Sequence, residues 1–120
     1  MIAEGFVRAG AKVYITSRKA KELNETCLRL SELGECIAIP SDLSQLDGIK
    51  QLADELISRE SKLDILINNA GATWGAPIDE FPESGWDKVM DLNVKSVFFL
   101  TQKLLPLLRS AATKDEPARV

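Results

Sequence analysis

Residues 62–71 have the sequence Lys-Leu-Asp-Ile-Leu-Ile-Asn-Asn-Ala-Gly. Its central apolar run, Leu63–Ile67, is short, nearly continuous and rich in β-branched side chains, which is typical of a strand covered by helices on both faces of a parallel sheet. The run stops at two asparagines, a small residue and a glycine, which favour a turn that another molecule can approach. Ligands of open α/β sheets bind at the carboxyl ends of strands. The stretch therefore predicts a buried strand that ends in a binding site, with an ordinary turn as the alternative.

The composition bounds the class of protein and its partners. The chain has 120 residues, of which 45% are hydrophobic and 28% charged, and its net charge is -3. These values are typical of one globular domain, and the scattered basic residues argue against a nucleic-acid partner. The sequence contains neither an apolar run long enough to span a membrane nor a secretory signal, so we expect a soluble, cytoplasmic protein with no membrane partner.

Histidine is absent and there are two cysteines. The lack of histidine excludes Ser-His-Asp and Cys-His catalysis and histidine-based metal sites within this stretch. Cys27 and Cys36 lack metal-ligand spacing and lie in apolar patterns, so we predict buried free thiols and no metal site.

Helix and strand patterns alternate along the chain at the spacing of βαβ units. We expect helices that end at the capping glycines Gly10 and Gly34, and a long interior helix that Pro106 kinks or ends. The expected helices are residues 1–9, 20–33, 44–57 (with a capping box at Ser44 and Asp47) and 82–108, and the expected strands are residues 12–16, 36–40, 63–67 and 118–120. The fold class is α/β, a partial Rossmann-type doubly wound parallel sheet. Residues 1–120 then form an incomplete dinucleotide-binding domain.

Polar side chains follow two of the expected strands. Ser17 and Arg18 come directly after residues 12–16, and Asp42 and Leu43 follow residues 36–40. An acidic residue at such a position binds the ribose hydroxyls of NAD, whereas an arginine accommodates the 2′-phosphate of NADP. The pattern favours NADP(H). The alternative is that Arg18 is simply a solvated residue at the entrance of a helix.

The second half of the chain contains two further candidate functional residues, Asn93 and Trp74. Asn93 lies on the apolar stripe of the long helix, four residues from both Val89 and Val97, where an unpaired amide costs about 1–3 kcal/mol. We therefore expect a hydrogen-bonding partner for it, in a functional or a purely structural role. Trp74, in a loop rich in glycine and proline, either walls a substrate pocket or packs on the surface.

The motif Asn68–Gly71 in its strand context resembles the short-chain dehydrogenase/reductase family, and Arg18, Asp42-Leu43 and Asn93 match the family pattern as well. The resemblance covers residues 1–120 and is greatest to 3-oxoacyl-acyl-carrier-protein reductases of the rhamnolipid type. It implies an NADP(H)-dependent oxidoreductase that reduces a small carbonyl substrate, or oxidises an alcohol, by hydride transfer. It also implies a homo-oligomer, a dimer or tetramer, packed through residues 86–110. The implied cofactor-binding residues are Ser17, Arg18, Asp42, Leu43, Asn69, Ala70 and Gly71.

The resemblance gives Asn93 a catalytic role, as the anchor of a water chain that serves a lysine. The family pattern also has a glycine-rich turn, which we expect before Met1, and a serine and Tyr-x-x-x-Lys, which we expect after Val120. A chain without them lacks the central strand and the general acid, so residues 1–120 alone are expected to be unstable and inactive. One alternative is a naturally short, non-catalytic form that binds a full-length partner. Another is a different nucleotide-binding α/β domain, such as a sugar-nucleotide epimerase or a methyltransferase.

Overall fold

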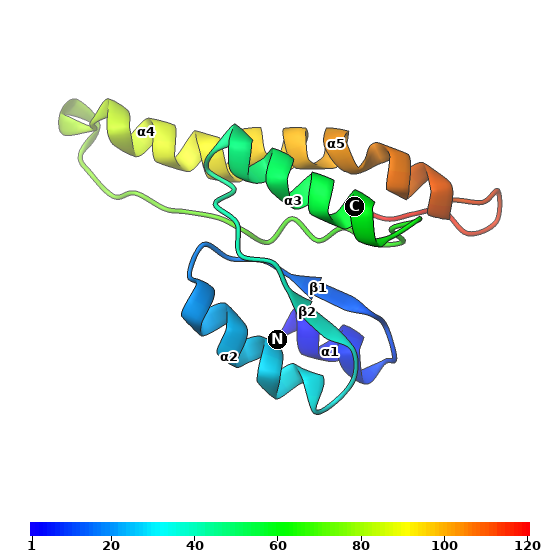
Figure 1. The fold of residues 1–120 in the computed structure, drawn as a ribbon. Helices are drawn as coiled ribbons and strands as arrows, with labels where there is room; N and C mark the ends of the chain where they lie inside the picture. Colours follow the sequence, from blue (N-terminus) through cyan, green and yellow to red (C-terminus); the bar gives the residue numbers. More distant parts are fainter. The chain divides into compact units, whose positions relative to one another are not determined.

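The computed structural model describes residues 1–120, which divide into two compact units, Met1–Asp42 and Leu43–Val120. Figure 1 shows the path of the chain through both units. Helices and parallel pairing alternate along the sequence as the apolar patterns predict, which confirms the α/β class. None of the helices combines the length and the apolar character needed to cross a membrane.

The first unit is a small parallel sheet with two helices. Its elements are α1 (Ile2–Arg8), β1 (Val13–Ile15), α2 (Ala20–Ser31) and β2 (Cys36–Ala38). The strands pair in parallel with Tyr14 opposite Ile37. Backbone hydrogen bonds continue beyond the strands, because Ile39 N–H donates to Ile15 C=O (3.0 Å) and Ser41 N–H donates to Ser17 C=O (3.1 Å). The pairing therefore fixes the carboxyl ends of the two strands side by side.

The core of this unit lies between the helices and the sheet. Val7, Leu30 and Cys36 are buried there, with partly buried apolar side chains around them. Both cysteines are free, as predicted, but only Cys36 is buried; Cys27 is half-buried and its thiol donates to the Cys36 carbonyl over 3.2 Å. Burial, with a smaller contribution from Cys27, raises the pKa of the Cys36 thiol to about 11, so the thiol stays protonated at neutral pH.

The two predicted capping glycines differ in their roles. Gly10 has a φ of 89°, its N–H donates to Val7 C=O, and it ends α1 as predicted. Gly34 does not cap α2, which ends at Ser31 and has Glu32 as its C-cap in a right-handed conformation. A Cβ on Gly34 would stand 2.9 Å from a Val7 methyl carbon, so its small size instead permits the close approach of α1.

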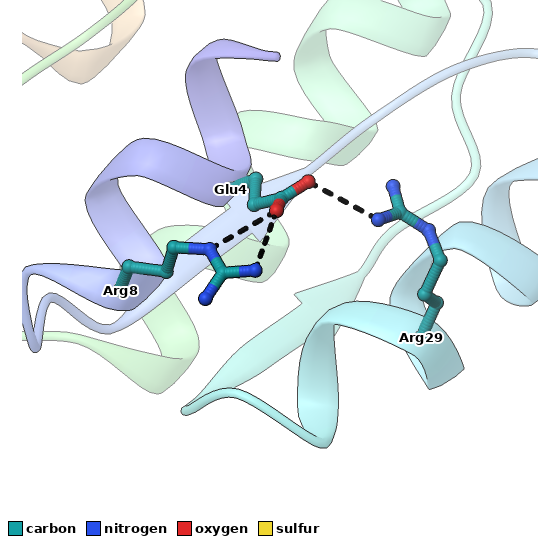
Figure 2. Close-up of polar contacts among 3 residues, drawn as sticks. All are labelled: Glu4, Arg8 and Arg29. Carbon is teal, nitrogen blue, oxygen red and sulfur yellow. Dashed lines mark hydrogen bonds and ion pairs between the residues drawn. The ribbon is translucent and has the colours of Figure 1, made fainter.

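An ion-pair cluster joins α1 to α2 on the surface of the first unit. Figure 2 shows the Glu4 carboxylate between two guanidinium groups: Arg8 Nη2 lies 2.9 Å from Oε1, and Arg29 Nη1 lies 3.1 Å from Oε2. Both arginines hold the pKa of the Glu4 carboxyl below its ordinary value of 4.5, with the hydrogen bond from Arg29 contributing most. The same two helices contribute Val7 and Leu30 to the buried core of the unit.

Replacing Arg29 with glutamine should lower the thermal midpoint by roughly 1–4 °C at neutral pH, because the exposed pair is solvent-screened. The pKa of Glu4 is lower in the folded state than in the unfolded state. The stabilisation of the fold by the Glu4 ion pairs is therefore complete above the ordinary glutamate pKa, and it is lost as the pH falls through the folded-state pKa. Thermal melts at a series of pH values measure it. Arg59→Gln, whose ion pair with Glu55 lies within a single helix, is the control and should shift the midpoint less. An Arg29 effect that persists at a pH well below the glutamate range would contradict this account.

The second unit is mainly helical. Its elements are α3 (Leu46–Arg59), the 3-10 turn η1 (Ile78–Glu80), α4 (Glu83–Met90), the π-helical turn η2 (Asp91–Lys95) and α5 (Ser96–Ala111). Helix α3 packs along α5, as Figure 1 shows. The stripe predicted on α3 is confirmed except at Ile57, which is exposed, and the N-cap residue of the helix is Gln45, one position after the predicted Ser44. The buried apolar residues are Ile49, Leu52, Ala53 and Leu56 on α3, and Leu100, Leu104, Leu107 and Leu108 on α5.

Of the two effects predicted for Pro106, a kink or an end of the helix, the end is wrong, because α5 continues to Ala111. A proline inside a helix costs about 3 kcal/mol, whereas burying a leucine side chain contributes about 1.5–3 kcal/mol. Leu104, Leu107 and Leu108 are all buried around Pro106. Their combined burial outweighs the loss of one hydrogen bond and carries the helix through the proline.

The predicted strand at residues 63–67 is reduced to a single parallel bridge between Ile65 and Arg119. Arg119 N–H donates to Asp64 C=O and Leu66 N–H donates to Arg119 C=O, both over 2.9 Å. The pairing predicted for residues 118–120 is thus present, on one side only. With so little sheet around it, Ile65 keeps 36% of its surface exposed and Ile67 keeps 48%.

The predicted helix at 82–108 is helical throughout, but it is neither uniform nor wholly interior. The π turn η2 separates α4 from α5, and the sequence carries no proline or glycine that marks it. Trp86 on the predicted apolar stripe is 59% exposed, whereas Leu100 and Leu104 on the same stripe are buried. Only the α5 portion of the stripe faces α3, since α3 has no comparable packing against α4.

Candidate functional site

In the first unit, the parallel pairing of β1 and β2 brings two predicted site segments together. The hydrogen bond from Ser41 N–H to Ser17 C=O places Ser17-Arg18 beside Ser41-Asp42 at the carboxyl ends of the strands. Ser17 Oγ accepts a hydrogen bond from Lys19 N–H (3.2 Å), a local turn contact that leaves the hydroxyl proton available. This edge is where an α/β sheet binds its ligand.

Arg18 differs from the other two arginines of this unit. Arg8 and Arg29 bind the Glu4 carboxylate, whereas the Arg18 side chain is exposed and makes no ion pair or hydrogen bond within the chain. A guanidinium has five N–H donors arranged for bidentate recognition of a phosphate. The arrangement can therefore bind a phosphate group without breaking any existing contact.

Asp42 and Leu43 follow β2 at the boundary of the two units. Asp42 is half-buried, and the Leu43 side chain is buried with 8% exposure. The side chain of Leu43 is therefore committed to the interior. Any contact of Leu43 with a ligand has to use its backbone groups.

In the second unit, the segment Asn68–Gly71 leaves the bridged stretch and is held by few contacts. Asn69 N–H donates to Ile67 C=O (3.0 Å), a tight turn, and Asn68 Nδ2 donates to Thr101 Oγ1 on α5 (3.4 Å). Asn69, Ala70 and Gly71 are all exposed. A Cβ on Gly71 would stand 3.1 Å from Asn93 Oδ1. The lack of a side chain at Gly71 therefore leaves room for the amide of Asn93.

Asn93 has the hydrogen-bonding partner that the sequence requires, but in a different setting. Ala72 N–H donates to Asn93 Oδ1 and Asn93 Nδ2 donates to Ala72 C=O, each over 2.8 Å. The predicted burial is wrong, because Asn93 is exposed. The amide closes a two-way clamp on the backbone that follows Asn68–Gly71.

The π turn η2 explains how a helix presents this amide. Asn93 is the central residue of Asp91–Lys95, where the helix is locally widened, and such turns are frequent at functional sites. Ser96, which is buried, donates its hydroxyl to Leu92 C=O over 2.6 Å and satisfies one carbonyl of the turn.

A contact between Gly85 on α4 and Trp74 was not predicted. A Cβ on Gly85 would stand 2.8 Å from three ring carbons of Trp74, so the indole lies directly on the glycine. Lys88 Nζ lies 5.5 Å from the centroid of the same ring. The sequence gives one signal for this contact, because Gly85 is an isolated glycine inside an otherwise helical pattern. Such a glycine indicates that another group packs closely on the helix, but it does not identify that group.

Comparison with known proteins adds a family to this geometry. The family model described as short chain dehydrogenase matches residues 1–115. The rhamnolipids biosynthesis 3-oxoacyl-[acyl-carrier-protein] reductase of Pseudomonas aeruginosa is 52% identical over 120 residues, which are 100% of this chain and 47% of that protein. The 2-dehydro-3-deoxy-D-gluconate 5-dehydrogenase of Escherichia coli is 38% identical over 102 residues, 84% of this chain and 40% of that protein. The chain thus spans about half the length of the curated relatives it matches.

Solved structures match the fold over nearly the whole chain. The Pseudomonas aeruginosa RhlG/NADP active-site complex has a TM-score of 0.94 and 52% identity, covering 99% of this chain and 46% of that one. The L-sorbose reductase of Gluconobacter frateurii, complexed with NADPH and L-sorbose, has a TM-score of 0.86 and 28% identity, covering 91% of this chain and 42% of that one. The Rossmann-type classification predicted from the sequence is confirmed by these matches.

Proposed function

The chain belongs to the short-chain dehydrogenase family, and we propose that the protein containing it is a cytoplasmic, NADP(H)-dependent oxidoreductase that reduces a carbonyl group. The observation that carries this proposal is the unpaired Arg18 guanidinium beside Ser17 at the carboxyl end of β1. The whole-chain similarity to a reductase solved as an NADP complex supports it. Another relative is a 2-dehydro-3-deoxy-D-gluconate 5-dehydrogenase, so the relatives act on different substrates. The cofactor and the substrate class of this protein are therefore proposed separately.

The residues of the first unit fit the adenosine end of NADP(H). Ser17 and Arg18 supply hydroxyl and guanidinium donors for the 2′-phosphate, and the absence of an acidic side chain at these two positions avoids repulsion. Asp42 accepts hydrogen bonds from an adenine amino group, and Leu43, the first residue of the second unit, contributes its backbone. We assign Asn69, Ala70 and Gly71 of the second unit to the same cofactor, as exposed backbone after the bridged segment. When bound, the reduced nicotinamide supplies the hydride.

Asn93 is proposed as a positioning residue of the catalytic machinery. Its clamp on Ala72 fixes the backbone that directly follows Gly71, so the amide determines where that segment stands. We also propose that Asn93 supports the proton-relay water chain that the family resemblance implies.

The substrate is proposed to be a carbonyl compound of the 3-oxoacyl thioester class, in line with the name of the 52% identical relative. A homo-oligomer is proposed through α4 and α5. On α5, Val97, Phe98 and Leu105 line a shallow apolar groove, and Phe98 is 62% exposed. The same groove is the feature that favours the second candidate function, a non-catalytic chain that binds a full-length copy.

The decisive experiment is a spectrophotometric assay of NADPH oxidation by the protein that contains this chain, with a 3-oxoacyl coenzyme A thioester. We expect substrate-dependent oxidation of NADPH and a much slower reaction with NADH. The thioester that lacks the 3-oxo group is the control and should give no oxidation. Absence of turnover together with co-purification of a longer homologous chain would favour the non-catalytic candidate instead.

A further inference from the structure

The segment 70–77 is restrained by contacts with α4 and with the π turn η2 that follows α4. Its only hydrogen bonds from Ala70 through Ala76 are the pair between Ala72 and Asn93. The second restraint is the contact of Trp74 with Gly85 and Lys88 on α4. The segment has no secondary structure of its own, so these two contacts restrain its position.

The geometry of the indole shows which side of it remains open. Gly85 and Lys88 are three residues apart on α4 and so lie on one face of the helix. The ring rests across that face, with the glycine in contact and the lysine ammonium close enough for a cation–π interaction. Trp74 nevertheless keeps 40% of its surface exposed. The exposed part is therefore the side turned away from α4.

The chemistry of the segment limits what this surface can bind. Residues 70–77 read Ala-Gly-Ala-Thr-Trp-Gly-Ala-Pro and carry no charged side chain and one hydroxyl. A site for a sugar or a sugar acid needs several placed hydrogen-bonding or charged groups, whereas a hydrocarbon chain needs only apolar area. The segment also leaves the carboxyl end of the bridged stretch, which is the ligand-binding end in this class of fold.

We propose that Trp74 is a substrate-contacting residue whose exposed indole face binds the apolar carbon chain next to the reacting carbonyl, and that Gly85 is the positioning residue that seats it. This inference rests on the proposed carbonyl reductase function. It selects long-chain acyl substrates over short or polyhydroxylated ones. Gly85 acts through its lack of a side chain, because any Cβ displaces the ring.

The test compares an acetoacetyl and a 3-oxodecanoyl coenzyme A thioester in the protein that contains this chain. Trp74→Ala should lower kcat/KM for the long-chain thioester by about tenfold, the effect of losing contact with one or two methylene groups, and leave the short-chain value nearly unchanged. The KM for NADPH should not change. Trp74→Phe, which keeps an aromatic surface, should restore most of the discrimination.

The variant Gly85→Ala tests whether Gly85 positions the Trp74 ring or affects only the stability of α4. Alanine is the better helix former, so a purely structural glycine would give equal or higher thermal stability and unchanged discrimination. We expect the long-chain kcat/KM to fall as it does in Trp74→Ala, and the double variant to fall no further, because both changes remove the same contact. Trp86→Ala, at the exposed tryptophan next to Gly85, is the matched control and should retain the discrimination.

The outcomes separate the two proposals. If the unmodified protein reduces neither thioester with NADPH, the proposed function fails and the inference fails with it. If it reduces both, but Trp74→Ala changes their kcat/KM values equally or the two single effects add, the inference alone is overturned. A preference for polyhydroxylated ketones that is lost in Trp74→Ala would likewise overturn the assignment to acyl chains.

Discussion

Replacing Arg18 with aspartate is expected to reverse the cofactor preference from NADPH to NADH. The guanidinium is exposed and has no partner within the chain, so its full donor set is available to the 2′-phosphate. A charge-assisted hydrogen bond contributes about 1.5–3 kcal/mol, which corresponds to a loss of about ten- to a hundredfold in kcat/KM for NADPH. Aspartate at the same strand end accepts bonds from the ribose hydroxyls of NADH, so kcat/KM for NADH should rise.

Steady-state kinetics with both cofactors at two salt concentrations measure this effect. The wild-type preference should decrease at high salt, because exposed charges are screened. Arg109→Asp is the matched control, since Arg109 is also exposed and unpaired but lies in the last turn of α5. It should leave the cofactor ratio unchanged. Equal kcat/KM for NADPH and NADH in the unmodified protein would refute the role of Arg18.

Replacing Asn93 with leucine is expected to lower kcat by about a hundredfold while the fold persists. The change removes both hydrogen bonds to Ala72 and frees the backbone after Gly71, and a displacement of about 1 Å near a reacting centre costs on that order. Ala72 is half-buried, so leaving its two backbone groups without the amide lowers the stability by about 1–3 kcal/mol. Denaturant unfolding and steady-state kinetics measure the two effects separately.

The pH profile distinguishes a role in proton relay from a purely structural one. If Asn93 supports the proton-relay water chain, the variant should show a displaced pH optimum as well as a lower kcat. Lys95→Leu, at an exposed position of the same π turn, is the control and should leave both unchanged. Full activity of Asn93→Leu at an unchanged pH optimum would make Asn93 a structural residue only.

The sequence by itself determined what depends on neighbours along the chain. The apolar period predicted α3, the glycine pattern predicted the left-handed turn at Gly10, and turn chemistry located Ser17-Arg18 and Asp42 after strands. Helix periodicity, caps and strand ends are local properties, so a short window of residues contains the whole signal. The family resemblance had the same basis, in the motif Asn68–Gly71.

Only the tertiary structure decided which distant groups meet. In the folded chain Asn93 is exposed and hydrogen-bonded to Ala72. Gly34 lies against Val7, and Gly85 lies against Trp74. Helix α5 continues through Pro106. Each of these outcomes depends on atoms that come from other parts of the sequence and on how much apolar surface the contact buries. A local pattern shows that a glycine is small or an amide polar, but the partner that makes the property matter is set by packing.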